Sequence, residues 1–201
     1  MARNIYAEIA AKDADAVSKE KLKISFEFVD WDSEDLFFIH GIEPAYYHKL
    51  FECITTIKNS LEKQITEQSH PSLRPKSIFN TATSVRDSFP DSVVDRLVQR
   101  LKVETDTDEE ARDKAIEYSK RAFEVSPSKS YGRIHGFVWN NTFHVVWFDP
   151  AHNLYPWLGK GKKPKPPSTI RCFSPEEAFK LREEIDALKK ENSELWEALG
   201  E

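Results

Sequence analysis

The residues best suited to chemistry gather in one segment, 131–157. This segment contains an arginine, three histidines and a tyrosine: Arg133, His135, His144, His152 and Tyr155. Imidazole and phenol groups transfer protons, and a guanidinium group stabilises negative charge on phosphate oxygens. The set therefore suits general acid–base chemistry on a phosphodiester, with Arg133 stabilising charge and a histidine or Tyr155 moving protons.

Two apolar-rich runs within the segment predict a β-hairpin that would bring this set together. The runs meet at Asn140-Asn141, and asparagine tolerates the positive φ that a two-residue hairpin turn requires. The cross-strand pairs expected on the core face are Val138 with Phe143, Gly136 with Val145, and Ile134 with Trp147. The opposite face would then carry Arg133, His135 and His144, with the two histidines on a diagonal of roughly 7–8 Å between Cβ atoms.

Two other interpretations of the same residues remain open at this point. In the first, four further apolar residues bury the second face as well and the histidines are structural: Phe137, Trp139, Val146 and Phe148. In the second, His144, Asp149 and His152 hold zinc or iron, since these ligand types suit both metals. Their spacing matches no metal motif, so we predict no metal site and no cofactor.

The segment also resembles a known family. The string GRIHGFVWNNTFHVVWFDPAHNLYP has a strand with an arginine, a tight turn, a second strand followed by a histidine, and then a tyrosine. It is similar to the closing hairpin of RelE/ParE-type toxins of bacterial toxin–antitoxin modules, and to a group of bacterial and phage proteins. RelE-type toxins cleave mRNA on the ribosome through basic residues and often a C-terminal tyrosine. The resemblance therefore implies a catalytic site made of Arg133, His144, His152 and Tyr155.

The remaining patterns in the body predict an α+β fold with an antiparallel sheet. Alternating residues predict a strand at 22–28 that forms a hairpin with 36–39, and helical periodicity predicts one long helix from Pro44 to Ile65. Further helices are expected at 90–103 and 108–122. The expected core consists of Ile24, Phe26, Phe28, Ile54, Ile57, Leu61, Val138, Phe143, Val145 and Trp147.

A C-terminal helix carries the pattern of a parallel dimeric coiled coil. Ser174 is its expected N-cap, and the seam positions that follow Ala178 are Leu181, Ile185, Leu188, Asn192, Leu195 and Leu199. A single asparagine at an a position favours parallel dimers. We therefore expect a parallel homodimer.

We expect three regions in the chain: a body at 1–155, a linker at 156–173 and the coiled-coil helix at 174–201. The linker holds Lys160, Lys162, Lys163 and Lys165, whereas the whole chain carries a net charge of −5. Those lysines could contact nucleic-acid phosphates, but the acidic body opposes RNA binding.

No apolar run is long enough to span a membrane, and the two cysteines form no disulfide framework, so we expect a cytoplasmic protein. The sequence predicts a dimeric protein-binding or regulatory protein of a bacterial or phage defence or toxin–antitoxin module. The alternative is a RelE-like ribonuclease toxin that uses the Arg/His/Tyr set.

Overall fold

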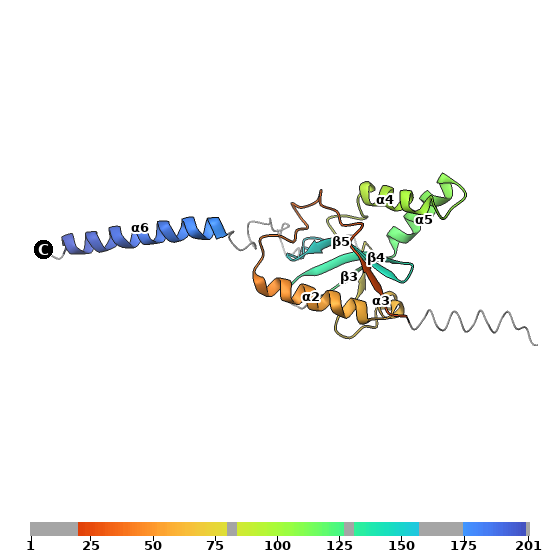
Figure 1. Ribbon diagram of the computed structural model, residues 1–201, viewed down its shortest axis with the longest axis horizontal. Coiled ribbons are helices and arrows are strands. Elements are labelled where there is room, and N and C mark those ends of the chain that lie inside the picture. Colours follow the sequence, from red (N-terminus) through yellow and green to blue (C-terminus); the bar gives the residue numbers. More distant parts are fainter. Residues whose placement is uncertain (1–19, 80–83, 127–130, 157–174, 200–201) are drawn as a thin grey trace, which may run out of the picture.

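The computed structural model describes residues 20–79, 84–126, 131–156 and 175–199 (Figure 1). The elements follow the order β1 (Lys23–Ser25), α2 (Pro44–Asn59), α3 (Glu62–Thr66), β2 (Lys76–Ser77), α4 (Asp91–Leu101), α5 (Asp108–Lys120), β3 (Ala122–Val125), β4 (Arg133–Trp139), β5 (Thr142–Asp149) and α6 (Pro175–Leu199). The fold is α+β, as the sequence predicts. None of the helices in these ranges is long and apolar enough to cross a membrane.

The sheet is mixed rather than wholly antiparallel. Its strand order is β1-β5-β4-β3-β2, and β1 pairs with β5 in parallel while the other neighbours are antiparallel. The expected hairpin between 22–28 and 36–39 is wrong, because 36–39 forms no strand. After β1 the chain turns, and Asp30 holds it against β5: its N–H donates to Val146 O (3.0 Å) and its carboxylate accepts from Trp147 Nε1 (2.8 Å).

The β4–β5 hairpin forms at the predicted turn. Asn140 and Asn141 have φ angles of 49° and 50°, and Val138 pairs with Phe143 as expected. Beyond Gly136 the register shifts by one residue, so Trp147 pairs with His135 and not with Ile134. Such a bulge moves every later side chain of β5 to the opposite face.

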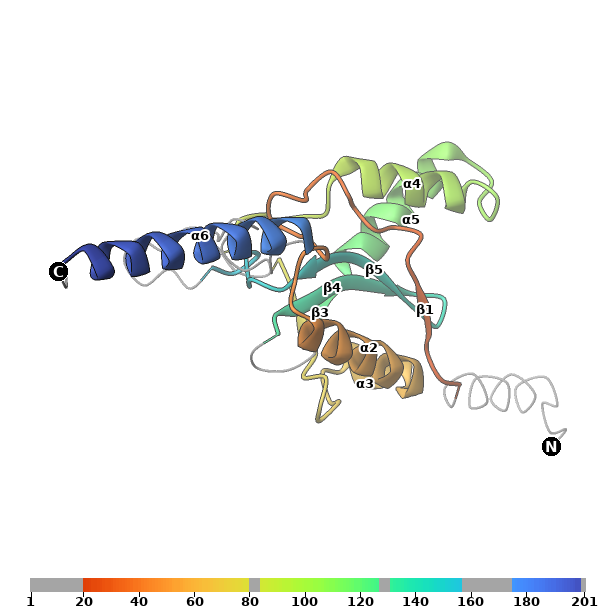
Figure 2. The ribbon, with the colours of Figure 1, turned by 60° about the vertical axis from the view of Figure 1, so that its left-hand side comes forward.

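Helices cover both faces of the sheet (Figure 2). One apolar cluster packs α2 and α3 against Val138, Phe143 and Val145. The other packs α4 and α5 against Phe137 and Trp147. Both faces of the hairpin are therefore buried, because no sheet face is left for water.

The predicted helix from Pro44 to Ile65 is interrupted at Ser60. Ser60 is buried, and its backbone is extended with ψ 162°. A new helix, α3, begins after Leu61, whose N–H donates to the side chain of Gln64 at 2.8 Å. Polar satisfaction at this break, rather than apolar spacing, decides where α2 ends.

Most of the predicted core is buried, but not all of it. Phe26 is 48% exposed, and Ile24, Ile54 and Leu61 are half-buried. Helix α6 forms where the heptads predict it, and its seam residues Ile185, Leu188 and Leu195 are 49%, 57% and 56% exposed. The expected cap Ser174 and the lysines Lys160, Lys162, Lys163 and Lys165 lie outside the described residues.

Candidate functional site

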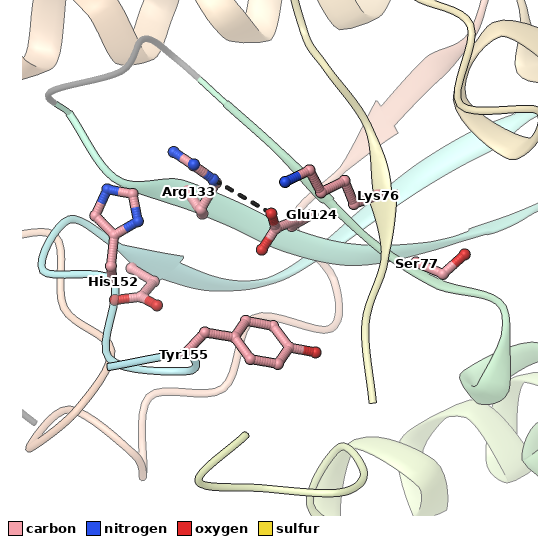
Figure 3. A pocket seen from close by; sticks show the side chains of 7 residues that line it. Lys76, Ser77, Glu124, Arg133, His152 and Tyr155 are labelled. Atoms are coloured by element: carbon pink, nitrogen blue, oxygen red, sulfur yellow. Dashed lines mark hydrogen bonds and ion pairs between the residues drawn. The ribbon is translucent and has the colours of Figure 1, made fainter. Parts of the chain in front are cut away.

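A polar pocket of about 390 Å³ opens at the end of the sheet where β4 begins and β5 ends (Figure 3). Strands β2, β3, β4 and β5 contribute side chains to it, as does the loop that follows β5. The lining residues are Lys76, Ser77, Glu124, Arg133, Asp149, His152 and Tyr155. Two cationic and two carboxylate side chains thus meet at one opening.

The structure brings three of the five sequence-predicted residues together. Arg133, His152 and Tyr155 line the pocket. His135 is fully buried and contacts the pocket residue Asp149, with 3.2 Å between Nε2 and Oδ2. His144 is not among the lining residues. The hairpin therefore assembles a smaller set than its sequence suggests.

Glu124 and the backbone hold Arg133 in place. Its Nη1 donates to Gly132 O (2.7 Å) and Ser126 Oγ (3.1 Å), and its Nε lies 3.4 Å from Glu124 Oε1. Glu124 itself is only 7% exposed. These contacts use Nε and Nη1, so Nη2 is the part of the guanidinium that can donate to an anion while the other nitrogens hold the side chain in place.

Asp149 positions the loop that carries His152 and Tyr155. Its Oδ1 accepts the N–H of Asn153 (2.6 Å) and its Oδ2 accepts the N–H of Leu154 (2.8 Å). Within this loop His152 has a positive φ of 60°. A carboxylate that is 1% exposed and carries these bonds fixes the local backbone, so His152 and Tyr155 keep a defined place at the pocket.

The start of this loop is also fixed by close contact between the end of β5 and the residue that precedes β4. Gly132 has φ +73°, and a Cβ at this position would lie 2.1 Å from Asp149 O. Only glycine combines that conformation with such a contact. Gly132 thereby lets the start of β4 pass directly against the end of β5, next to Arg133.

The environment of His152 favours a neutral imidazole. Partial burial lowers its pKa, and the nearby charge of Arg133 lowers it further. A neutral imidazole at neutral pH accepts a proton. The phenol oxygen of Tyr155 accepts the N–H of Phe79 at 2.8 Å, and such a donor stabilises negative charge on that oxygen when its proton leaves.

His144 lies in an aromatic sandwich instead. Its ring stacks on Phe137 (5.0 Å between centroids) and Trp139 (5.5 Å), and it meets Phe28 edge-on at 5.2 Å. Burial lowers its pKa to about 4, although the Trp139 backbone acts in the opposite direction. The diagonal contact with His135 expected on an open face is replaced by this packing, because helices cover that face too.

Sequence reasoning missed Lys76, Ser77 and Glu124 as pocket residues. Glu124 had one signal, since it is the single acid in the apolar run AFEV at 122–125. Strand β2 has only two residues, too few to show a period. Within the described ranges, no group of three His, Cys, Asp or Glu side chains is arranged to hold a metal ion.

Comparison of the chain with protein-family models, with curated proteins and with solved structures gives no match.

Proposed function

We propose that the protein is a ribonuclease whose pocket cleaves an RNA phosphodiester by general acid–base catalysis. The observation that carries this proposal is the meeting of Arg133, His152 and Tyr155 in one pocket. These are the residue types that the resemblance to RelE-type toxins implies. Lys76 adds a second cation for phosphate at the same opening.

The chemistry follows from the protonation states that the pocket favours. Neutral His152 accepts the proton of a ribose 2′-hydroxyl, and the 2′ oxygen attacks phosphorus. The bond between phosphorus and the 5′ oxygen breaks, and Tyr155 donates its proton to that leaving oxygen. Arg133 neutralises the charge that builds on the phosphoryl oxygens in between.

The test measures cleavage of a single-stranded RNA oligonucleotide and of mRNA on ribosomes by the full chain. We expect products with 2′,3′-cyclic phosphate ends, and no cleavage where the 2′-hydroxyl is replaced by hydrogen. His152→Ala and Tyr155→Phe should each lower the cleavage rate about 100-fold, because each removes one proton-transfer group.

Two matched variants control for nonspecific damage. His48→Ala changes an exposed histidine on α2, and Tyr118→Phe removes a phenol on α5 outside the pocket. Both should cleave at the wild-type rate, and all four variants should melt cooperatively. Wild-type protein that cuts neither substrate, or an unchanged rate in His152→Ala, contradicts the proposal.

A second candidate function, as a dimeric protein-binding or regulatory protein, is favoured by the surface of α6. Its seam residues Ile185, Leu188 and Leu195 are about half exposed, and Trp196 is 70% exposed. Apolar side chains repeated at heptad spacing on one exposed helix favour pairing with a second helix. The occupant we propose is α6 of a second copy, in parallel.

Sedimentation of the full chain tests this pairing. We expect a dimer at micromolar concentration, and a monomer after deletion of 175–201. A monomeric full chain would contradict the dimer while leaving the proposed cleavage chemistry intact, since the pocket residues all come from the body.

A further inference from the structure

A second hollow lies on another part of the body and has the opposite character. This apolar groove has a volume of about 440 Å³ and runs between the turn after β1, the loop before α2, and α2 itself. Its exposed aromatic side chains are Phe26 (48%), Trp31 (63%) and Phe51 (63%). None of the pocket residues described above lines it.

Helix α2 has two apolar stripes, and the second is only partly covered. Tyr46, Leu50, Cys53 and Ile57 are buried. Tyr47, Phe51 and Ile54 follow one another at spacings of four and three on a neighbouring stripe and line the groove. A stripe with this spacing presents the ridges that a second helix packs against, so the groove is shaped for a helix.

Hydrogen bonds fix the two loops that form walls of the groove. The guanidinium of Arg96 donates to the carbonyl oxygens of Glu27, Phe28 and Val29 at 3.0–3.1 Å. On the opposite side, Tyr47 Oη donates to Ile39 O at 2.8 Å. Because these bonds fix both loops, a ligand would not have to order them on binding.

Exposed carboxylates accompany the groove along the chain. Each of the three exposed aromatic residues is followed directly by an exposed carboxylate, in the pairs Phe26-Glu27, Trp31-Asp32 and Phe51-Glu52. Glu52 contacts Lys49 at 2.7 Å, whereas Glu27 and Asp32 form no ion pair within the described part of the chain. Residues 26–54 hold seven acids against one lysine.

We propose that this groove binds a basic amphipathic helix of another protein. Apolar side chains on one face of that helix would enter the groove beside Trp31 and Phe51, and lysine or arginine on its flanks would face Glu27 and Asp32. A second copy of this chain is a poor complement, because its groove is equally acidic and residues 172–201 hold nine acids against four bases.

Fluorescence anisotropy of a labelled model peptide tests the proposal with the full chain. The probe is a helix of about 18 residues, five turns, with leucine at i, i+3, i+4 and i+7 spacing and lysine elsewhere. One matched peptide carries glutamate in place of lysine, and another has the leucines and lysines in scrambled order. We expect the probe to bind and both matched peptides to bind at least about tenfold more weakly.

Variants locate the binding on the protein. Trp31→Ala and Phe51→Ala should each lower the affinity for the lysine peptide at least about tenfold, as expected for exposed aromatic anchors. Val103→Ala, which removes an apolar side chain that is 82% exposed after α4, should bind like wild type. Both aromatics are exposed, so these changes should not unfold the protein.

The proposal is overturned by no binding of the lysine peptide, by equal binding of the glutamate peptide, or by unchanged binding of the lysine peptide to Trp31→Ala and Phe51→Ala. A shift from dimer to monomer in Trp31→Ala would instead identify a second copy as the occupant, and would also overturn it. RNA cleavage should be unaffected by these variants, which separates this result from that of the pocket.

Discussion

A single buried histidine should make the stability of the protein depend on pH. The pKa of His144 is about 4 in the folded state, whereas a histidine in an unfolded chain titrates near 6.5. The unfolded state therefore binds more protons between these values, and stability falls as the pH drops from 6.5 to 4. The full effect at one residue amounts to about 3 kcal/mol of unfolding free energy.

Chemical denaturation at several pH values checks this, with His144→Phe as the diagnostic variant. Phenylalanine keeps the aromatic stack with Phe137 and Trp139 but cannot be protonated, so the slope of stability against pH should decrease. Some slope remains, because the pKa values of His70 and His152 are lowered as well. An identical pH profile for His144→Phe and wild type would mean that His144 is accessible to protons in the folded state.

The carboxylate of Asp149 supports both the fold and the pocket. Asp149→Asn replaces one acceptor oxygen by an NH₂ group, so one of the N–H groups of Asn153 and Leu154 or the contact with His135 is lost. We expect a loss of roughly 1–3 kcal/mol in unfolding free energy, together with slower RNA cleavage because the loop of His152 shifts. Asp113→Asn, at an exposed position of α5, is the control and should change neither quantity.

At the scale of elements, the β4–β5 turn is the simplest place to test the fold. Asn140 has φ 49°, a conformation that costs a residue with a Cβ and no local polar group roughly 1–2 kcal/mol. Asn140→Ala should therefore lower the unfolding free energy by about 1 kcal/mol, while Asn140→Gly should be close to neutral. Equal melting temperatures for the two variants would show that the turn does not impose this conformation.

The same hairpin shows which structural features a sequence pattern can predict and which it cannot. Its turn and its first pairs could be predicted, because Asn140-Asn141 and the apolar alternation are local signals. The bulge beyond Gly136 could not, since the bulged part of β5 contacts a distant residue: Asp30, more than a hundred residues away, bonds to Val146 and Trp147. One shifted residue then changes the face on which Trp147 lies.

The same distinction between local and distant contacts decides which residues of the pocket could be predicted. Arg133, His152 and Tyr155 belong to one segment, so their types and spacing predict that they lie in one site. Glu124 and Lys76 reach the pocket through strands of four and two residues, and pairing at this length leaves no periodic trace in the sequence. The sequence left the burial of His144 open as one of two alternatives, because burial requires helices on both sheet faces, which no single strand reveals.

On the scale of the whole molecule, charge separates the surfaces that we assign. The pocket joins Lys76 and Arg133 with two carboxylates, exposed carboxylates accompany the groove along the chain, and α6 belongs to an acidic C-terminal region. The dimer that we propose through α6 would therefore depend on its apolar seam and on ion pairs between flanking residues. Such a seam of just over three heptads gives modest affinity, so the choice of seam residues should matter strongly.

Asn192 is the seam residue that should set both affinity and specificity. A polar group buried between two helices costs stability, but it also selects the parallel dimer, in which the two asparagine side chains meet. Asn192→Leu should strengthen association measurably in sedimentation equilibrium and should allow trimers or higher species to appear. Ser193→Leu, one position off the seam, is the matched control and should leave the dimer unchanged. Equal association of wild type and Asn192→Leu would show that the predicted seam is not the surface through which α6 pairs.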